Sequence, residues 1–103
     1  MAFQKIKMTL KDLKEGMVTG EEVNGKMLVI LMYQGKVYAL DAVCTHEGGP
    51  LQDGSIDGHA LICPWHAGAF DIPTGKASEN TPWVTDIVMH AVQMNGDEIS
   101  VDS

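Results

Sequence analysis

Alternating hydrophobic and polar residues predict short β-strands along most of the chain. Ile6, Met8 and Leu10 alternate with polar residues, as in a strand with one buried face. Apolar and β-branched residues are also concentrated in Lys26–Tyr33 and Lys36–Asp41, which we expect to be strands. No stretch shows a sustained apolar period of 3.6 residues, the pattern typical of an amphipathic helix. The sequence therefore predicts an all-β protein.

Turn-forming dipeptides separate the expected strands. Asn24-Gly25 joins a candidate strand at Met17–Val23 to Lys26–Tyr33, and Asn-Gly favours a two-residue hairpin turn because both residues tolerate positive φ. LKDLKEG, at 10–16, fits one short helical or 3₁₀ turn. Further turns are expected at Gln34-Gly35, Asp57-Gly58 and Asn95-Gly96, with strands in HALIC (59–63), DIVMHAVQM (86–94) and EISVD (98–102). Methionines in these strands are expected to fill the core.

Two segments, 44–58 and 63–83, interrupt the pattern and are rich in glycine and proline. Long loops in a small β domain usually carry function. The 103 residues are expected to form one domain, residues 1–103. The core of so small a domain contributes modest stability, so a bound metal could add to it.

Charge and hydropathy narrow the class of partner. The formal net charge of −7 argues against nucleic acid and allows steering toward a basic partner protein. The first residues lack the apolar run of a signal peptide, and the longest apolar run is too short to span a bilayer. We therefore expect a cytoplasmic protein with no membrane association, whose thiols stay reduced.

The chain has two cysteines, and each stands beside a histidine. One residue separates Cys44 from His46, two separate Cys63 from His66, and sixteen separate the two pairs. The other two histidines, His59 and His90, fall in strand patterns without a cysteine neighbour, which favours structural roles.

Several kinds of site could use the two Cys–His pairs. A disulfide between Cys44 and Cys63 would conflict with a reducing compartment. A Cys–His nucleophile would explain one pair and leave the other idle. A zinc site of two cysteines and two histidines usually groups like ligands, whereas each pair here is mixed. In a Rieske centre two cysteines hold one iron and two histidines hold the other, so each loop supplies one ligand to each iron.

The residues around the pairs resemble the Rieske signature. CTHEGGPLQDGSIDGHALICPWHAGAFDIPTGKA is similar to Cys-x-His, a spacer, then Cys-x-x-His-x-x-x-Phe-Asp with Thr-Gly following. The resemblance covers nearly the whole chain and is greatest to the small Rieske-type ferredoxins. It implies two cluster-binding loops on a base of small antiparallel sheets, the Rieske fold. It also implies one 2Fe-2S cluster, with Cys44, His46, Cys63 and His66 as its ligands.

The same resemblance suggests which other residues surround the cluster. Gly48, Gly49 and Gly68 could offer backbone N–H groups to the sulfurs or could be ordinary turn glycines. Pro64 shapes the second loop, and Pro82 resembles the proline of a third, covering loop. Trp65 is expected to shield the cluster, and Trp83 to belong to either the core or a docking surface.

Four residues mark a difference from respiratory and photosynthetic Rieske proteins. Gly49 and Trp65 stand where those proteins carry an extra disulfide-forming pair of cysteines. Gly68 and Phe70 stand where those proteins have a serine and a tyrosine that donate hydrogen bonds to sulfur. Such donors stabilise the more negative reduced cluster. We therefore expect a midpoint potential toward the lower end of the Rieske range of about −150 to +300 mV.

The resemblance implies an electron-transfer protein, not an enzyme, which could be a component of a multicomponent oxidoreductase. It would accept one electron from a flavoprotein reductase and pass it to a terminal oxygenase, with His46 and His66 facing the partner. It would be a monomer or a weak dimer. Two alternatives stay open: a small electron-transfer subunit of a larger reductase, such as nitrite reductase, and a zinc-stabilised binding module.

Overall fold

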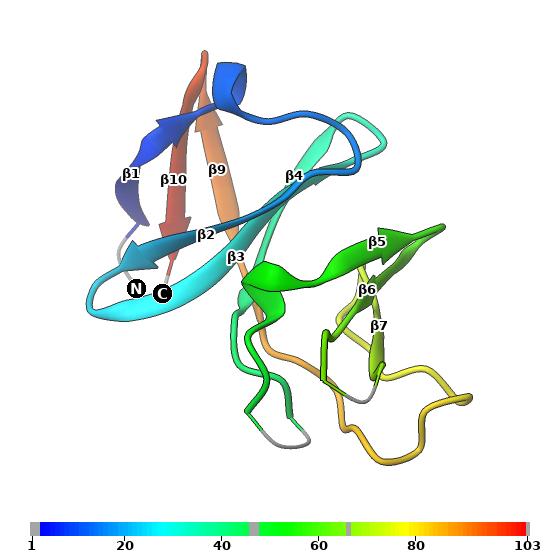
Figure 1. Ribbon diagram of the computed structural model, residues 1–103. Coiled ribbons are helices and arrows are strands. Elements are labelled where there is room, and N and C mark those ends of the chain that lie inside the picture. Colours follow the sequence, from blue (N-terminus) through cyan, green and yellow to red (C-terminus); the bar gives the residue numbers. More distant parts are fainter. Residues whose placement is uncertain (1–2, 46–47, 66, 103) are drawn as a thin grey trace.

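The strands form three antiparallel sheets in the part of the chain that the computed structural model describes, residues 3–45, 48–65 and 67–102 (Figure 1). The first sheet has the order β1 (Phe3–Thr9), β10 (Glu98–Asp102), β9 (Val92–Asn95). The second has the order β2 (Val18–Val23), β3 (Lys26–Tyr33), β4 (Lys36–Asp41), β8 (Met89–His90). The third has the order β5 (Ser55–Asp57), β6 (Ala60–Ile62), β7 (Ala69–Asp71), and short 3₁₀ turns occupy η1 (Leu10–Asp12) and η2 (Leu51–Asp53).

Strand β3 lies at the centre of the molecule and is buried on both faces. Leu28 and Ile30 face one apolar cluster, shared with Ile99 of β10. Val29 and Leu31 face the other cluster, which contains residues of β6 and β7. A strand that packs on both sides reads as a continuous apolar run, which explains MLVILMY at 27–33.

Tight turns set the register of the central sheet. Val23 pairs with Lys26 across Asn24-Gly25, and both turn residues have positive φ, 55° and 80°. Gln34-Gly35 makes the same kind of turn between β3 and β4, with φ of 52° and 77°. These values confirm the two-residue hairpins expected from the sequence.

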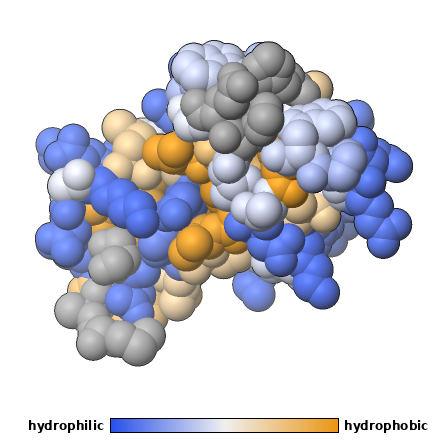
Figure 2. Space-filling view, turned by 90° about the horizontal axis from the view of Figure 1, so that it is seen from below, coloured by the Kyte–Doolittle hydropathy of each residue, from blue (hydrophilic) through white to orange (hydrophobic). Residues whose placement is uncertain are grey.

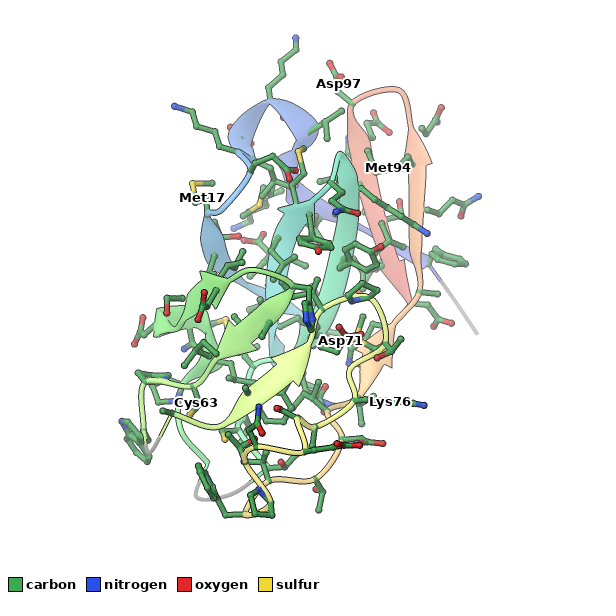
Figure 3. All side chains as sticks on the ribbon, turned by 90° about the vertical axis from the view of Figure 1, so that its right-hand side faces the viewer. Met17, Cys63, Asp71, Lys76, Met94 and Asp97 are labelled. Atoms are coloured by element: carbon green, nitrogen blue, oxygen red, sulfur yellow. The ribbon has the colours of Figure 1, made fainter. Side chains whose placement is uncertain are left out.

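Three connecting segments extend from the sheets at one end of the molecule, the lower end in Figure 1. The first ligand loop is residues 44–49, which follows β4. The second ligand loop is residues 63–68, which joins β6 to β7. The covering segment is residues 78–87, which lies between β7 and β8. Figure 3 places Cys63 toward this end, and Met94 and Asp97 at the opposite end.

The structure differs from the sequence expectations in three places. The segments expected to be irregular contain β5 and β7, each only three residues long and too short to show a period. The single strand expected over 86–94 is two short strands, because the chain leaves the second sheet after His90 and joins the first at Val92. Met27 and Met94 are 39% and 40% exposed, so they do not fill the core.

No helix in residues 3–45, 48–65 and 67–102 is long and apolar enough to cross a membrane.

Candidate metal centre

Cys44 and Cys63 lie together inside the apolar cluster between the second and third sheets. Their exposed fractions are 3% and 1%, and neither takes part in a disulfide. Burial raises the pKa of the Cys63 thiol, and the neighbouring Cys44 thiol raises it further, while the Trp65 N–H acts in the opposite direction. The fold thus brings together two sulfur donors that are nineteen residues apart in the sequence.

The described residues of the two ligand loops share two backbone features. The N–H of Cys44 donates to the carbonyl of Gly49 at 2.9 Å, and the N–H of Cys63 donates to the carbonyl of Gly68 at 2.7 Å. In each loop the residue before that glycine has positive φ, 74° at Gly48 and 56° at Ala67. Each cysteine therefore begins a turn that the carbonyl five residues later closes.

Gly49 and Gly68 occupy positions where a side chain would not fit. An added Cβ on Gly49 would lie 2.7 Å from Cys63 Sγ and 3.2 Å from Trp65 Cβ. An added Cβ on Gly68 would lie 2.6 Å from Val84 Cγ1. The first loop thus approaches the second through Gly49, and the covering segment approaches the second loop at Gly68.

One backbone donor is directed at a sulfur in the described loops, and it comes from Trp65. Its N–H lies 3.4 Å from Cys63 Sγ, while its indole is 49% exposed. Gly48, for which the sequence left open a sulfur donor or an ordinary turn glycine, donates its N–H to the carbonyl of Cys44 at 3.1 Å and so is a turn glycine. Pro64 is exposed at the turn that leads to Trp65.

Two threonine hydroxyls that the sequence did not single out attach the covering segment to the first ligand loop and to the start of β7. The Thr45 hydroxyl donates to the carbonyl of Thr85 at 2.8 Å and accepts from the N–H of Thr85 at 3.0 Å. The Thr81 hydroxyl accepts from the N–H of Ala69 at 3.3 Å. No periodicity or motif marks such hydroxyls, since their partners are backbone groups distant in sequence. Pro82 and Trp83 lie on the same segment and are exposed.

The two predicted nitrogen ligands, His46 and His66, lie outside the described residues. Among residues 3–45, 48–65 and 67–102, no group of three histidine, cysteine or acidic side chains is placed to hold a metal ion. Such a group is not expected there, because only two of the four predicted ligands, Cys44 and Cys63, belong to those ranges.

His59 and His90 make structural contacts, as their strand patterns suggested. His59 Nδ1 lies 2.8 Å from Asp71 Oδ1, and the Thr74 hydroxyl donates to Asp71 Oδ2 at 2.7 Å. The hydrogen bond from Thr74, then that from His59, lowers the pKa of Asp71 against the opposing effect of burial.

His90 joins β8 to β4 and to β10. Its Nε2 lies 2.6 Å from Asp41 Oδ1, and its Nδ1 lies 3.2 Å from the carbonyl oxygen of Asp102. Lys26 Nζ approaches the same Asp41 oxygen at 3.0 Å. Burial raises the pKa of Asp41, but the hydrogen bonds and charges of His90 and Lys26 outweigh burial and lower it overall.

The residues present fit an iron–sulfur cluster on the sulfur side. Two buried thiols face one another, and Gly49 keeps the space beside Cys63 Sγ free of a side chain. Burial raises the pKa of the Cys63 thiol and so disfavours its thiolate form in the metal-free protein, whereas a bound ferric ion would stabilise that thiolate. This donor pair suits a metal with a preference for thiolates.

Comparison with known proteins identifies the family. The family model described as the Rieske [2Fe-2S] domain matches residues 4–99. A Ralstonia relative, the ferredoxin component of naphthalene 1,2-dioxygenase/salicylate 5-hydroxylase systems, is 41% identical over 85 residues, covering 82% of this chain and 81% of the relative.

Two solved structures have the same fold. The ferredoxin of carbazole 1,9a-dioxygenase from Nocardioides aromaticivorans has a TM-score of 0.88 and 29% identity, covering 98% of this chain and 97% of that one. A chain in a complex of reduced oxygenase and oxidized ferredoxin of carbazole 1,9a-dioxygenase has a TM-score of 0.84 and 26% identity, covering 96% and 91%. Together with the family match over nearly the whole chain, these likenesses show that this protein belongs to the Rieske [2Fe-2S] domain family and that its cofactor is a Rieske-type 2Fe-2S cluster.

Proposed function

We propose that this protein is a ferredoxin that carries one electron from a flavoprotein reductase to a terminal oxygenase. Cys44 and Cys63 would hold one iron of the cluster, and His46 and His66 the other. The whole chain, residues 1–103, would serve as a single Rieske domain. The observation that carries the proposal is the pair of buried, unbridged thiols in a chain of this family.

The surroundings of the two cysteines support their role as ligands. Both sulfurs lie in an apolar cluster with Phe70 and Val84, which keeps water from them. When bound, the cluster supplies a centre that takes up and releases one electron. The protein holds the sulfur donors in a fixed, dry position, so little reorganisation accompanies each transfer. The assignment of His46 and His66 rests on the sequence motif.

Exposed apolar side chains surround the ligand loops and support docking at this end. Val43 and Val88 are 58% and 55% exposed, and Trp65 and Trp83 are 49% and 43% exposed. Val43 precedes the first ligand loop and Trp65 lies in the second. Trp83 lies on the covering segment, and Val88 follows it. Figure 2 views the molecule from this end and shows hydrophobic residues across the middle of the face, among hydrophilic ones. Aromatic side chains in such patches often contribute most to binding.

The partner assignment follows the relatives. The Ralstonia relative is a component of dioxygenase and hydroxylase systems, and the second solved structure is a complex of an oxygenase with a ferredoxin. The net charge of −7 would steer this chain toward a basic docking surface on a partner. The reductase is inferred from the same role, because a carrier that reduces an oxygenase must itself be reduced.

Spectroscopy of the purified protein tests the cofactor and its ligands. Iron and acid-labile sulfide are expected at two of each per chain, with a low-temperature EPR signal that appears on reduction with dithionite. Replacing His46 or His66 with cysteine should change that signal toward the type of a four-cysteine cluster. A preparation that holds one zinc and no iron would overturn the proposal.

Stopped-flow electron transfer tests the docking face. Trp65→Ala and Trp83→Ala are each expected to lower the second-order rate constant for oxygenase reduction about tenfold, the effect of losing a binding hot spot. Phe3→Ala is the matched control, since Phe3 is a 44% exposed aromatic on β1, away from the ligand loops. If all three replacements changed the rate constant equally, the oxygenase would not dock at the face that contains Trp65 and Trp83.

The alternative role, a permanent subunit of a larger reductase, stays a prediction with its own test. A carrier should purify as a monomer or weak dimer and exchange between partners within milliseconds to seconds. A subunit should co-purify with a large chain in a complex that survives dilution.

A further inference from the structure

Thr45 lies between two proposed ligands, yet its hydroxyl bonds to the covering segment. It donates to the carbonyl of Thr85 at 2.8 Å and accepts from the N–H of the same residue at 3.0 Å. Both hydrogen bonds of this hydroxyl therefore go to one peptide segment forty positions away. A valine would have nearly the same shape and could make neither bond.

At its other end the covering segment is attached to Ala69 of β7, the residue that follows the second ligand loop. The N–H of Ser78 donates to the carbonyl of Ala69 at 2.9 Å, and the N–H of Ala69 donates to the Thr81 hydroxyl at 3.3 Å. Thr81 is only 8% exposed, and its carbonyl accepts from the N–H of Val84 at 3.2 Å. Residues 78–84 thus form a compact turn that is hydrogen-bonded to Ala69 of β7.

Between these two attachments, the covering segment packs on the second ligand loop. Val84 is 5% exposed and approaches Gly68 so closely that an added Cβ there would lie 2.6 Å from Val84 Cγ1. Trp83 Nε1 would lie 3.7 Å from the same Cβ. A contact that holds residues 83–85 in place therefore also keeps Val84 and Trp83 against the second ligand loop.

We infer that Thr45 is a positioning residue that holds the covering segment across both ligand loops. It ties Thr85 to the first loop, while Thr81 ties the segment to Ala69 of β7, next to the second loop. This keeps Val84 and Trp83 over Gly68 and limits the access of water to the metal site. The inference rests on the proposed function for its redox consequence, whereas the contact itself does not depend on the metal.

Hydrogen exchange and redox titration of Thr45→Val test this inference on the protein as purified. The amide of Thr85 is expected to exchange about three- to tenfold faster than in the wild type, the effect of losing one exposed hydrogen bond. The midpoint potential is expected to rise, because greater access of water stabilises the more negative reduced state.

Two further variants separate positioning from general destabilisation. Thr45→Ser keeps the hydroxyl, so the exchange rate of the Thr85 amide and the midpoint potential should both equal those of the wild type. Thr19→Val is the matched control, because the Thr19 hydroxyl also donates to a backbone carbonyl, that of Ile30 at 2.8 Å, but on β2. Thr19→Val should change neither the Thr85 amide nor the midpoint potential.

The outcomes distinguish this inference from the proposed function. An unchanged Thr85 amide or an unchanged midpoint potential in Thr45→Val would overturn the inference, as would equal changes in Thr19→Val. If the protein holds zinc and no iron, the proposed function fails, and the exchange of the Thr85 amide alone decides whether Thr45 positions the segment.

Discussion

Gly49 of the first ligand loop lies directly against Cys63 of the second, so that a Cβ on Gly49 would stand 2.7 Å from Cys63 Sγ. Real Cβ atoms essentially never come so close to a neighbouring atom, so any side chain at residue 49 must displace the sulfur. In respiratory and photosynthetic Rieske proteins this position carries an extra cysteine. Here the absence of a side chain lets the two ligand loops approach one another.

Gly49→Ala should impair the metal site by moving Cys63. We expect a loss of about 1–3 kcal/mol in unfolding free energy from overpacking, and an iron content well below that of the wild type. Gly48→Ala is the control, because an added Cβ there meets its nearest atom at 3.8 Å and the change strains only the backbone. Normal iron and sulfide content in Gly49→Ala would contradict the close contact.

Phe70→Tyr should raise the midpoint potential. Phe70 is fully buried in the apolar cluster that contains both cysteines, so a new hydroxyl there would seek a sulfur acceptor. A hydrogen bond stronger by about 1 kcal/mol in the reduced state corresponds to a rise of about 40 mV for one electron. Phe3→Tyr, at an exposed residue of β1, should leave the potential unchanged. A lower potential in Phe70→Tyr would exclude such a bond.

Gly68→Ser introduces a hydroxyl where respiratory and photosynthetic Rieske proteins have a serine that donates to sulfur. This replacement requires a second substitution to make room for the side chain. Its side chain would meet Val84, so we expect Gly68→Ser alone to destabilise the second loop. Gly68→Ser with Val84→Ala should bind iron normally and raise the potential above that of Val84→Ala. Equal iron contents in Gly68→Ser with and without Val84→Ala would show that Val84 does not limit the space.

Ala67→Gly should stabilise the protein. Ala67 has φ of 56°, a left-handed conformation that costs an L-residue roughly 1–2 kcal/mol and glycine almost nothing. Because glycine also loses more entropy on folding, we expect a net gain of about 0.5–1 kcal/mol, measured as a higher urea midpoint with an unchanged slope. Ala91→Gly, at an exposed residue without positive φ, should lower the midpoint instead.

The contribution of Asp41 to stability should disappear in acid. Its pKa in the folded protein lies below the ordinary value of 3.8, so folding favours the charged form. The stabilisation is therefore complete above that value and is lost as the pH falls through the lower pKa of the folded state. Asp41→Asn should cost about 1–3 kcal/mol at neutral pH and less at a pH below 3.8, measured by urea unfolding.

Asp57→Asn is the control for that experiment, because Asp57 is exposed at the end of β5. It should change the unfolding free energy little at either pH. A cost of Asp41→Asn that does not vary with pH would show that the carboxylate charge is irrelevant, and that only the hydrogen bonds to His90 and Lys26 matter.

Much of the fold could be predicted from local signals. The strands Lys26–Tyr33 and Lys36–Asp41 were predicted with their observed bounds, because a run of β-branched and apolar residues between two-residue turns is a strong local pattern. The three-residue strands β5 and β7 were not predicted, because so short a strand exists only through its pairing with β6.

The sequence by itself determined the hairpin register and the candidate ligands, because turn preferences and the Cys–His spacing are properties of neighbouring residues. Only the tertiary structure decided that Cys44 and Cys63 share one buried site, that Gly49 makes room for the sulfur, and that Thr45 reaches Thr85. The physical reason is that these contacts join loops from different sheets. Their geometry depends on how the sheets pack around β3, which no local pattern contains.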